Sequence, residues 1–270
     1  MTGRGWTGAD VAAVLRMPTA SDDKYSRGVV GIRTGSDAYP GAAVLGVEAA
    51  WRTGVGMVRY VGPRRAEDLV LARRPETVTA AGRVQAWVIG SGTDPDARTE
   101  AETAELRELL QGPVPVVVDA GAMSLAIAAS APLVVTPHGR EHARLRSLLG
   151  LDPDDADAVE ETADALGGVV VRKGARTLVA APGGGLIAVD APTSWLATAG
   201  TGDVLAGIIG ALVATVDASD ADALRSAAVS GVWIHGDAAR RASGARDGGP
   251  ITALDVAEHV PAVVGSLLTQ

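Results

Sequence analysis

The chain has 270 residues, of which 47% are hydrophobic, and its 24 basic and 32 acidic residues give a net charge of −8. That charge argues against a general nucleic-acid-binding protein, and the absence of cysteine excludes disulfides and thiolate metal sites. Only 3% of the residues are aromatic and none is phenylalanine, so we expect a valine-rich buried sheet under helices of alanine and leucine.

The first half of the chain alternates between short apolar runs and helical patterns. A short helix is expected from Thr7, where Asp10 completes a pattern close to a capping box. A second helix is expected over 39–54, with Pro40 near its start and Gly54 at its end. We expect a charged amphipathic helix over 96–112, and strands over 27–35, 55–63, 84–92 and 113–121.

The second half continues the alternation. Strands are expected over 132–139 and 169–177, and a hairpin over 177–192 has three glycines as its turn. Helices are expected over 140–150, within the acidic segment 152–168, along a long buried run from Thr198 to Val213, and over 221–242 and 252–268.

Alternating strands and helices indicate an α/β fold with a mostly parallel sheet and helices on both faces. Residues 1–270 are expected to form a single domain. The longest uncharged run is too short to span a membrane and the start has no apolar signal-peptide core, so we expect a soluble, cytoplasmic protein. Ligands of such sheets bind at the carboxyl ends of the strands.

Asp203 is the only charged residue in the apolar run from Thr198 to Val213, and it follows Gly200, Thr201 and Gly202. The first turn of a helix offers unpaired N–H groups and a partial positive charge, so this turn predicts an anion site. Asp203 is open to two interpretations. It is either a general base for a hydroxyl that attacks a phosphate, or only a helix cap.

Four further residues have both a functional and a structural interpretation. Asp119 ends an apolar strand and is either a site carboxylate or a cap for the next helix. His235 falls in an apolar helix, where we expect a hydrogen-bonded core histidine. Lys24 and Lys173 are the only lysines; they either occupy places where arginine cannot substitute or remain on the surface by chance, which composition alone favours.

The segment from His138 to His142 matches H-x-x-E-H, the inverted zinc-protease motif. We expect no zinc site here. Pro137 places His138 before the helix, and a third ligand would have to come from far away. From the residues alone, His138 is a loop histidine bonded to the backbone.

Six segments between Lys24 and Ala239 resemble, in order, blocks of the ADP-dependent NAD(P)H-hydrate dehydratases of the ribokinase-like superfamily. They are "GSDAYPGA", "VVVDAGAMSL", "LVVTPHGREHARL", "VVVRKGART", "ATAGTGDVLAGIIGALVA" and "AAVSGVWIHGDAA". The resemblance implies a three-layer α/β/α fold of the ribokinase-like type around a mostly parallel sheet.

The resemblance also implies a reaction. The substrate would be the S-form of hydrated NADH or NADPH, in which water has added to the nicotinamide ring. ADP would phosphorylate the ring hydroxyl, and loss of phosphate would restore NAD(P)H and leave AMP. Mg²⁺ is expected with the nucleotide phosphates, without an assigned protein ligand.

Site residues follow from the matched blocks. Asp203 would contact the substrate hydroxyl and act as the base. The residues implied to bind the nucleotide are Lys173, Gly174, Ala175, Arg176, Thr177, Gly200, Thr201 and Gly202. Those implied to contact the hydrated dinucleotide, besides Asp203, are Ala42, Gly90, Gly92 and His138.

Four positions depart from the family's pattern. Glycine is replaced by Asp94, Arg140 and Ala199, and Gly121 stands where the family has an acid. These differences bear on the dinucleotide contacts, most of all around Arg140.

Two rival functions use the same segments: a vitamin or sugar kinase on this fold, and a nucleotide-binding module without catalysis, against which Asp203 argues. Alanine-rich helices and candidate exposed tryptophans predict a homo-oligomer, with a tetramer as one candidate assembly. The epimerase domain often fused to this family has no room here, so a separate NAD(P)H-hydrate epimerase is an expected partner.

Overall fold

One eight-stranded sheet organises the computed structural model, which describes residues 5–269. Its order is β2-β1-β3-β4-β5-β6-β7-β8. Neighbours pair in parallel from β2 to β6, and the β7–β8 hairpin adds two antiparallel pairings at one edge. The strands are β1 (Val29–Arg33), β2 (Met57–Tyr60), β3 (Ala86–Ile89), β4 (Val116–Val118), β5 (Leu133–Val135), β6 (Val169–Arg172), β7 (Arg176–Ala180) and β8 (Ile187–Asp190).

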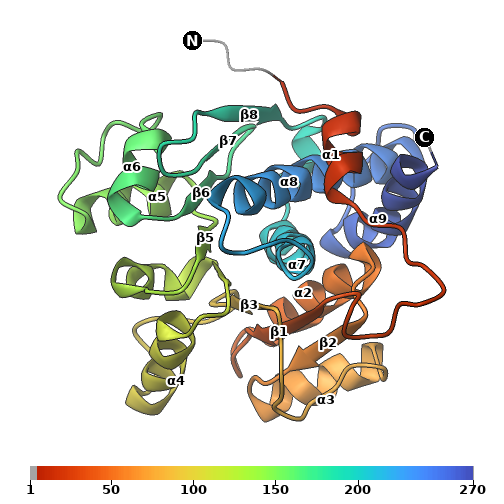
Figure 1. The fold of residues 1–270 in the computed structure, drawn as a ribbon, viewed down its shortest axis with the longest axis horizontal. Helices are drawn as coiled ribbons and strands as arrows, with labels where there is room; N and C mark the ends of the chain where they lie inside the picture. The colour runs from red at the N-terminus through yellow and green to blue at the C-terminus, as the bar shows by residue number, and fades with distance from the viewer. Residues whose placement is uncertain (1–4, 270) are drawn as a thin grey trace.

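Helices cover both faces of this sheet (Figure 1). One face carries α1 (Gly8–Val14), α2 (Gly41–Thr53), α7 (Thr201–Val213), α8 (Ala221–Gly244) and α9 (Ala253–Leu268). The other carries α4 (Glu100–Gln111), the 3-10 helix η1 (Ala120–Ala128), α5 (Gly139–Leu148) and α6 (Val159–Leu166). Helix α3 (Arg64–Arg73) packs against α2, and a short 3-10 turn, η2 (Ser194–Leu196), precedes α7. The predicted three-layer α/β fold is confirmed.

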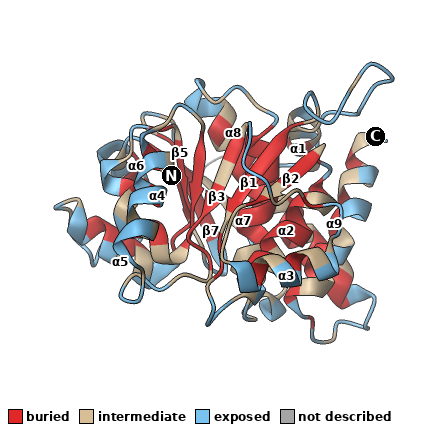
Figure 2. Cartoon of the chain, turned by 90° about the horizontal axis from the view of Figure 1, so that it is seen from below, coloured by how far each residue is buried: buried red, intermediate tan, exposed pale blue. Residues whose placement is uncertain are grey.

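The core is built from aliphatic side chains, as the composition predicts. Figure 2 shows buried residues along the strands and α7, and exposed residues on the outer faces of the peripheral helices. Every residue of α7 from Val204 to Val213 is buried. Its apolar length therefore reflects a helix enclosed between the sheet and its neighbouring helices.

The structure differs from the sequence expectations in local detail. Helix α3 and η1 were not expected. The strand expected over 132–139 ends at Val135, and the acidic segment 152–158 forms turns before α6 begins at Val159. Asp152, Asp154 and Asp155 are exposed there, so their carboxylates remain in water.

Helices α2 and α7 approach until their backbones touch. A Cβ on Gly207 would stand 2.3 Å from the carbonyl oxygen of Gly46 and 3.1 Å from the Cβ of Ala49. Only glycine at position 207 permits this approach. The contact fixes the starts of α2 and α7 relative to each other.

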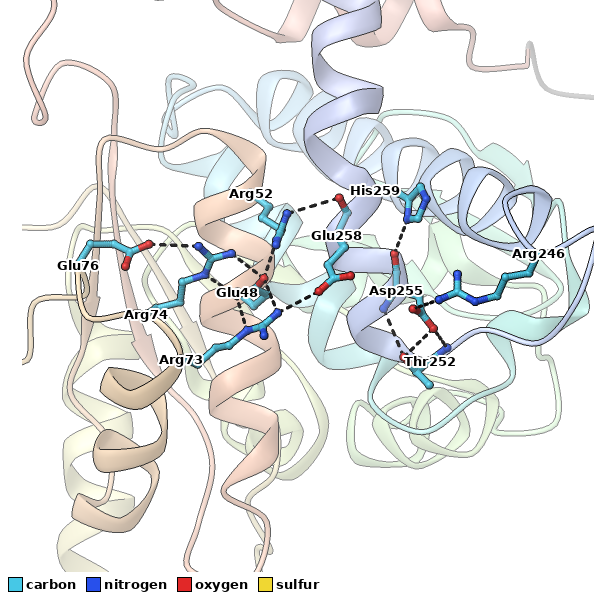
Figure 3. A network of polar contacts seen from close by, with 10 residues as sticks. All are labelled: Glu48, Arg52, Arg73, Arg74, Glu76, Arg246, Thr252, Asp255, Glu258 and His259. Atoms are coloured by element: carbon cyan, nitrogen blue, oxygen red, sulfur yellow. Dashed lines mark hydrogen bonds and ion pairs between the residues drawn. The ribbon is translucent and has the colours of Figure 1, made fainter.

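An ion-pair network around the buried Glu48 joins α2, α3 and α9 (Figure 3). The Glu48 carboxylate is fully buried and accepts from Arg52 Nε at 2.5 Å, Arg74 Nη2 at 2.6 Å and Arg73 Nη2 at 3.2 Å. Arg73 also reaches Glu258 on α9, at 3.1 Å. Although burial opposes its charge, the three guanidinium groups lower the pKa of Glu48 to about 2. The network therefore connects α2, α3 and α9, and we call it the Glu48 clamp.

The parallel topology brings the carboxyl ends of β1, β3, β4, β5 and β6 to one edge of the sheet. The amino end of α7 faces the same edge, since Gly202 lies against Lys173 just beyond β6. Between residues 5 and 269, no helix is both long and apolar enough to cross a bilayer.

Candidate active site

The amino end of α7 presents a set of backbone hydrogen-bond donors. Gly200 precedes the helix with φ of 89°, and a Cβ there would stand 2.5 Å from Leu45. No side chain caps the helix. Among described residues, the N–H groups of Gly202 and Asp203 have no hydrogen-bond acceptor. These donors and the helix dipole favour an anion.

Lys173 extends over this helix turn. Its ammonium lies 3.5 Å from where a Cβ of Gly202 would be, and 2.7 Å from Asp119 Oδ1. Burial opposes the positive charge, but the Asp119 carboxylate outweighs it, and the pKa of Lys173 is raised. Lys173 is therefore an ion-paired cation beside the predicted anion site. For this lysine, the interpretation as a surface residue left by chance is wrong.

Asp119 is the buried anchor of that cation. Its Oδ1 accepts from Thr136 Oγ1 at 2.7 Å, and its Oδ2 accepts from Ser91 Oγ at 2.8 Å. Its carboxylate makes no capping bond to η1. Of the two interpretations of Asp119, the structure thus supports a site carboxylate. Ser91 and Thr136 complete its hydrogen bonding, a role that sequence reasoning missed.

Asp203 lies in the first turn of α7 without a partner for its carboxylate among described residues. Burial raises its pKa to about 7; the nearby Asp119 charge acts in the same direction, and Lys173 opposes both. Near neutral pH the group therefore exists in both its protonated and ionised forms. A carboxylate with these properties is suited to accept a proton from a hydroxyl.

A pocket of about 400 Å³ opens beside these groups. We call it the α7 pocket. Its polar lining includes seven of the predicted site residues: His138, Lys173, Gly174, Ala175, Thr177, Thr201 and Gly202. Leu196, Leu205 and Val232 add an apolar wall. Its size and mixed lining suit a nucleotide, with phosphates at the helix end and the base against the apolar wall.

Other predicted residues lie outside that lining. The side chain of Arg176 is 63% exposed and lies 3.8 Å from Asp190. Gly92, with φ of 64°, packs on Ala42, because a Cβ there would be 2.4 Å from the Ala42 Cβ. Gly90 packs in the same way on the backbone of Asp119. The structure thus gathers Ala42, Gly90 and Gly92 at the carboxyl edge of the sheet. Gly200 and Asp203, at the amino end of α7, also lie outside the pocket lining.

His138 caps α5. Its Nδ1 accepts from the N–H groups of Arg140 at 3.1 Å and Glu141 at 3.3 Å, while Glu141 Oε2 accepts from the His138 N–H. His142 is turned elsewhere and shares a hydrogen bond with Thr162. Within residues 5–269 there is no cluster of three metal-ligating side chains. The contacts of these two histidines do not support a zinc site.

His235 lines the α7 pocket from α8 and is only 8% exposed. Its ring has a hydrogen bond with the backbone of Thr201, as expected for a core histidine, while its Nε2 has no hydrogen-bond partner in the described part of the chain. Burial lowers its pKa to about 4 and keeps the ring neutral. Its place in the sixth matched segment was the available signal.

A second pocket, of about 340 Å³, lies on the other side of the His138–Glu141 cap. We call it the α5 pocket. Two of the residues that depart from the family's pattern, Asp94 and Gly121, line it. Gly121 fits tightly there, since a Cβ would stand 2.1 Å from the carbonyl oxygen of Thr93. An acid at position 121 would not fit this packing.

Comparison with known proteins gives a consistent result. Residues 30–261 match the family described as NAD(P)H-hydrate dehydratase. The bifunctional NAD(P)H-hydrate repair enzyme Nnr of Mycobacterium tuberculosis is 46% identical over 225 residues, which cover 78% of this chain and 46% of that protein. The ADP-dependent (S)-NAD(P)H-hydrate dehydratase of Xanthomonas campestris is 35% identical over 264 residues, covering 85% of this chain and 86% of that one. The chain spans about half the length of the bifunctional relatives it matches.

Solved structures agree. The ADP/ATP-dependent NAD(P)H-hydrate dehydratase of Bacillus subtilis aligns with a TM-score of 0.83 at 26% identity, covering 97% of this chain and 98% of that one. A ribokinase-like superfamily protein of Enterococcus faecalis aligns with a TM-score of 0.84 at 20% identity, covering 99% and 97%. The second match shows the shared fold alone, and it confirms the predicted ribokinase-like type.

Proposed function

Because the chain belongs to the NAD(P)H-hydrate dehydratase family, we propose that it removes water from the S-form of hydrated NADH or NADPH at the expense of ADP. One observation of the site carries the proposal. Asp203, partly buried and without a partner within residues 5–269, stands in a helix turn whose N–H groups and neighbouring Lys173 suit a phosphate. A base beside a phosphate-binding turn is the arrangement that phosphorylation of a hydroxyl requires.

The first step transfers a phosphoryl group. ADP lies in the α7 pocket with its terminal phosphate at the amino end of α7. Asp203 takes the proton of the ring hydroxyl, and the hydroxyl oxygen forms a bond to phosphorus as the bond to AMP breaks. Lys173 and the N–H groups of the first turn stabilise the charge on the transferred group.

The second step eliminates phosphate. Hydroxide is a poor leaving group, whereas phosphate is a good one, and the electron pair of the ring nitrogen expels it. Loss of a proton from the neighbouring ring carbon restores the double bond. The products are NAD(P)H, AMP and phosphate, so one ADP is consumed for each molecule repaired.

The residues present fit Mg²⁺ only as an ion carried by the nucleotide. The described residues provide no cluster of three carboxylate or imidazole groups, and Mg²⁺ commonly binds through substrate phosphates with one or two carboxylates. Asp203 is a nearby carboxylate that has no partner in the described part of the chain. Bound there, Mg²⁺ would neutralise phosphate charge. The Bacillus subtilis relative was co-crystallised with ATP and Mg²⁺.

Two finer points belong to the same proposal. The donor is ADP, as in the name of the Xanthomonas relative. The hydrate of the opposite configuration is converted to the usable form by an NAD(P)H-hydrate epimerase. A vitamin or sugar kinase would use the same base, but the family match does not favour it.

The test is recovery of the near-ultraviolet absorbance of NADH from hydrated NADH with Mg²⁺ and either ADP or ATP. We expect recovery with ADP, matched by equal amounts of AMP and phosphate. Asp203→Asn should lower the turnover rate about 10²–10⁴-fold. Asp217→Asn makes the same change in the exposed loop that follows α7 and should not lower it. Tight ADP binding without any recovery would reject the dehydratase in favour of a kinase.

A further inference from the structure

A third pocket, of about 180 Å³, lies at the amino edge of the sheet. We call it the Arg27 pocket. Arg27 comes just before β1, Val55 just before β2, and Leu212 lies in the last turn of α7. The length of α7, about 20 Å for its 13 residues, separates this pocket from the turn that carries Asp203. Its lining shares no residue with that of the α7 pocket or the α5 pocket, so it is a separate cavity.

Much of the lining of the Arg27 pocket is apolar. The apolar side chains come from the ends of four helices, α1, α2, α7 and α9, and they include Leu15, Val55, Leu212, Val264 and Leu268. An apolar cavity of about 150 Å³ can bind benzene. The size and the lining of this pocket therefore suit one aromatic ring or a short branched chain.

Three charged side chains line the same pocket, and two of them pair with each other. Arg16 forms an ion pair with Asp22, whose carboxylate also accepts from the Thr19 N–H at 2.7 Å. Arg27 has no ion pair within residues 5–269. Its Nη2 donates to the Gly54 carbonyl oxygen at 3.0 Å, which uses one of its five N–H groups. The charge that remains uncompensated by a side chain in this pocket is therefore positive.

The guanidinium of Arg27 also lacks hydrogen-bond acceptors. Its Nε is buried and has no partner in the described part of the chain. The Leu212 carbonyl oxygen, at the end of α7, already accepts from the Thr215 N–H at 3.0 Å and from Thr215 Oγ1 at 2.7 Å. Buried polar groups in folded proteins nearly always have a hydrogen-bond partner. Because a carboxylate offers two oxygens to the N–H groups of a guanidinium, a ligand that carries one would supply the acceptors that Arg27 lacks.

We propose that the Arg27 pocket binds a small monocarboxylic acid with an apolar body, of which benzoate is the model. The carboxylate pairs with Arg27, and the ring lies against Leu212 of α7 and Val264 of α9. This inference does not rest on the proposed function, because the two sites share no lining residue. A ligand held there contacts both α7 and α9, and since it binds the folded chain alone, it stabilises that chain.

The experiment measures binding of benzoate by isothermal titration calorimetry, with benzamide as the uncharged analogue of the same shape. Benzoate should bind at least about tenfold more tightly than benzamide, and Arg27→Gln should weaken benzoate binding about ten- to a hundredfold, the loss expected for a charged hydrogen bond. Arg83→Gln is the matched control. Arg83 is exposed, has no hydrogen bond or ion pair within residues 5–269, and does not line the pocket.

A second variant locates the ligand without changing a charge. Val264→Phe places a ring in the apolar end of the pocket from a partly exposed position on α9, and it should block both benzoate and benzamide. Thermal unfolding without ligand shows that each variant is folded, and the unfolding midpoint of the unsubstituted protein should rise with benzoate concentration.

Four results would overturn the inference: no benzoate binding, equal binding of benzoate and benzamide, Arg27→Gln binding benzoate like Arg83→Gln, or binding that survives in a folded Val264→Phe variant. The last would place the ligand elsewhere, for example at the anion site of α7. None of these results bears on recovery of NADH from its hydrate, so the two proposals fail separately.

Discussion

Asp203→Asn should make the protein more stable, although it lowers the turnover rate. The substitution keeps the shape of the side chain and removes its ability to ionise. In the folded protein, burial and the Asp119 charge raise the pKa of Asp203 from 3.8 to about 7. Ionisation of Asp203 therefore lowers the stability of the folded protein, and the asparagine variant avoids this loss.

The size and the sign of the effect follow from linkage. Between pH 4 and 7 the folded protein retains a proton that the unfolded chain has lost, so the stability of the native protein falls as the pH rises through that window. From the two pKa values, the ionisable group costs about 4 kcal/mol at pH 8 and about 2 kcal/mol at pH 5. The stability advantage of Asp203→Asn should follow these values.

Urea unfolding of both proteins at pH 5 and pH 8, without ligands, measures the difference. The slope of free energy against urea should be the same in the two proteins, since the surface exposed on unfolding does not change. The reasoning is refuted if the asparagine variant is no more stable at pH 8, or if its advantage fails to shrink at pH 5.

Three further predictions follow from the same structure. The kcat/KM for the hydrate should rise about tenfold from pH 6 to pH 8 as Asp203 ionises. Asp119→Asn should move this rise to lower pH, because it removes a charge that raises the pKa of Asp203. If the rise stays at the same pH in that variant, a group other than Asp203 causes it. Glu48→Gln leaves three guanidinium groups without their buried carboxylate and should lower the free energy of unfolding by about 3–5 kcal/mol. An unchanged midpoint of urea unfolding would mean that the Glu48 clamp contributes nothing to stability. Gly207→Ala should cost about 1–3 kcal/mol through its clash with α2, while Gly265→Ala, in open space on α9, should be neutral or stabilising; equal effects in thermal unfolding would count against the close approach.

Patterns that depend on neighbouring residues were predictable. The capping box at Thr7, the left-handed Gly54 after α2 and the glycine turn of the β7–β8 hairpin were all expected, because each is set within a few residues of chain. Helix α3 was not predicted, because half of its residues are charged and it buries only Ala66 and Val70. With so small an apolar face, its sequence lacks the periodic pattern that indicates a helix.

The candidate site shows the same difference between features set by one short segment and features set by distant residues. The anion-binding turn of α7 and the position of Asp203 were readable, since both depend on one short segment. The pairing of Asp119 with Lys173 joins residues 54 apart in the chain, so no local pattern could distinguish it from a helix cap. The exposure of His235 to a pocket likewise depends on where α8 packs against the start of α7.

The backbone contact between Gly46 and Gly207 has a consequence for motion. Many enzymes close on their ligands by sliding or rotating one layer against another. Here the two helices that carry Ala42 and Asp203 touch directly and behave as one rigid frame. Rearrangement on ligand binding should therefore be confined to the segment 191–199 and the loops at the sheet edge. A descendant that acts on another hydroxyl compound could arise by changing those loops alone, with the frame left untouched.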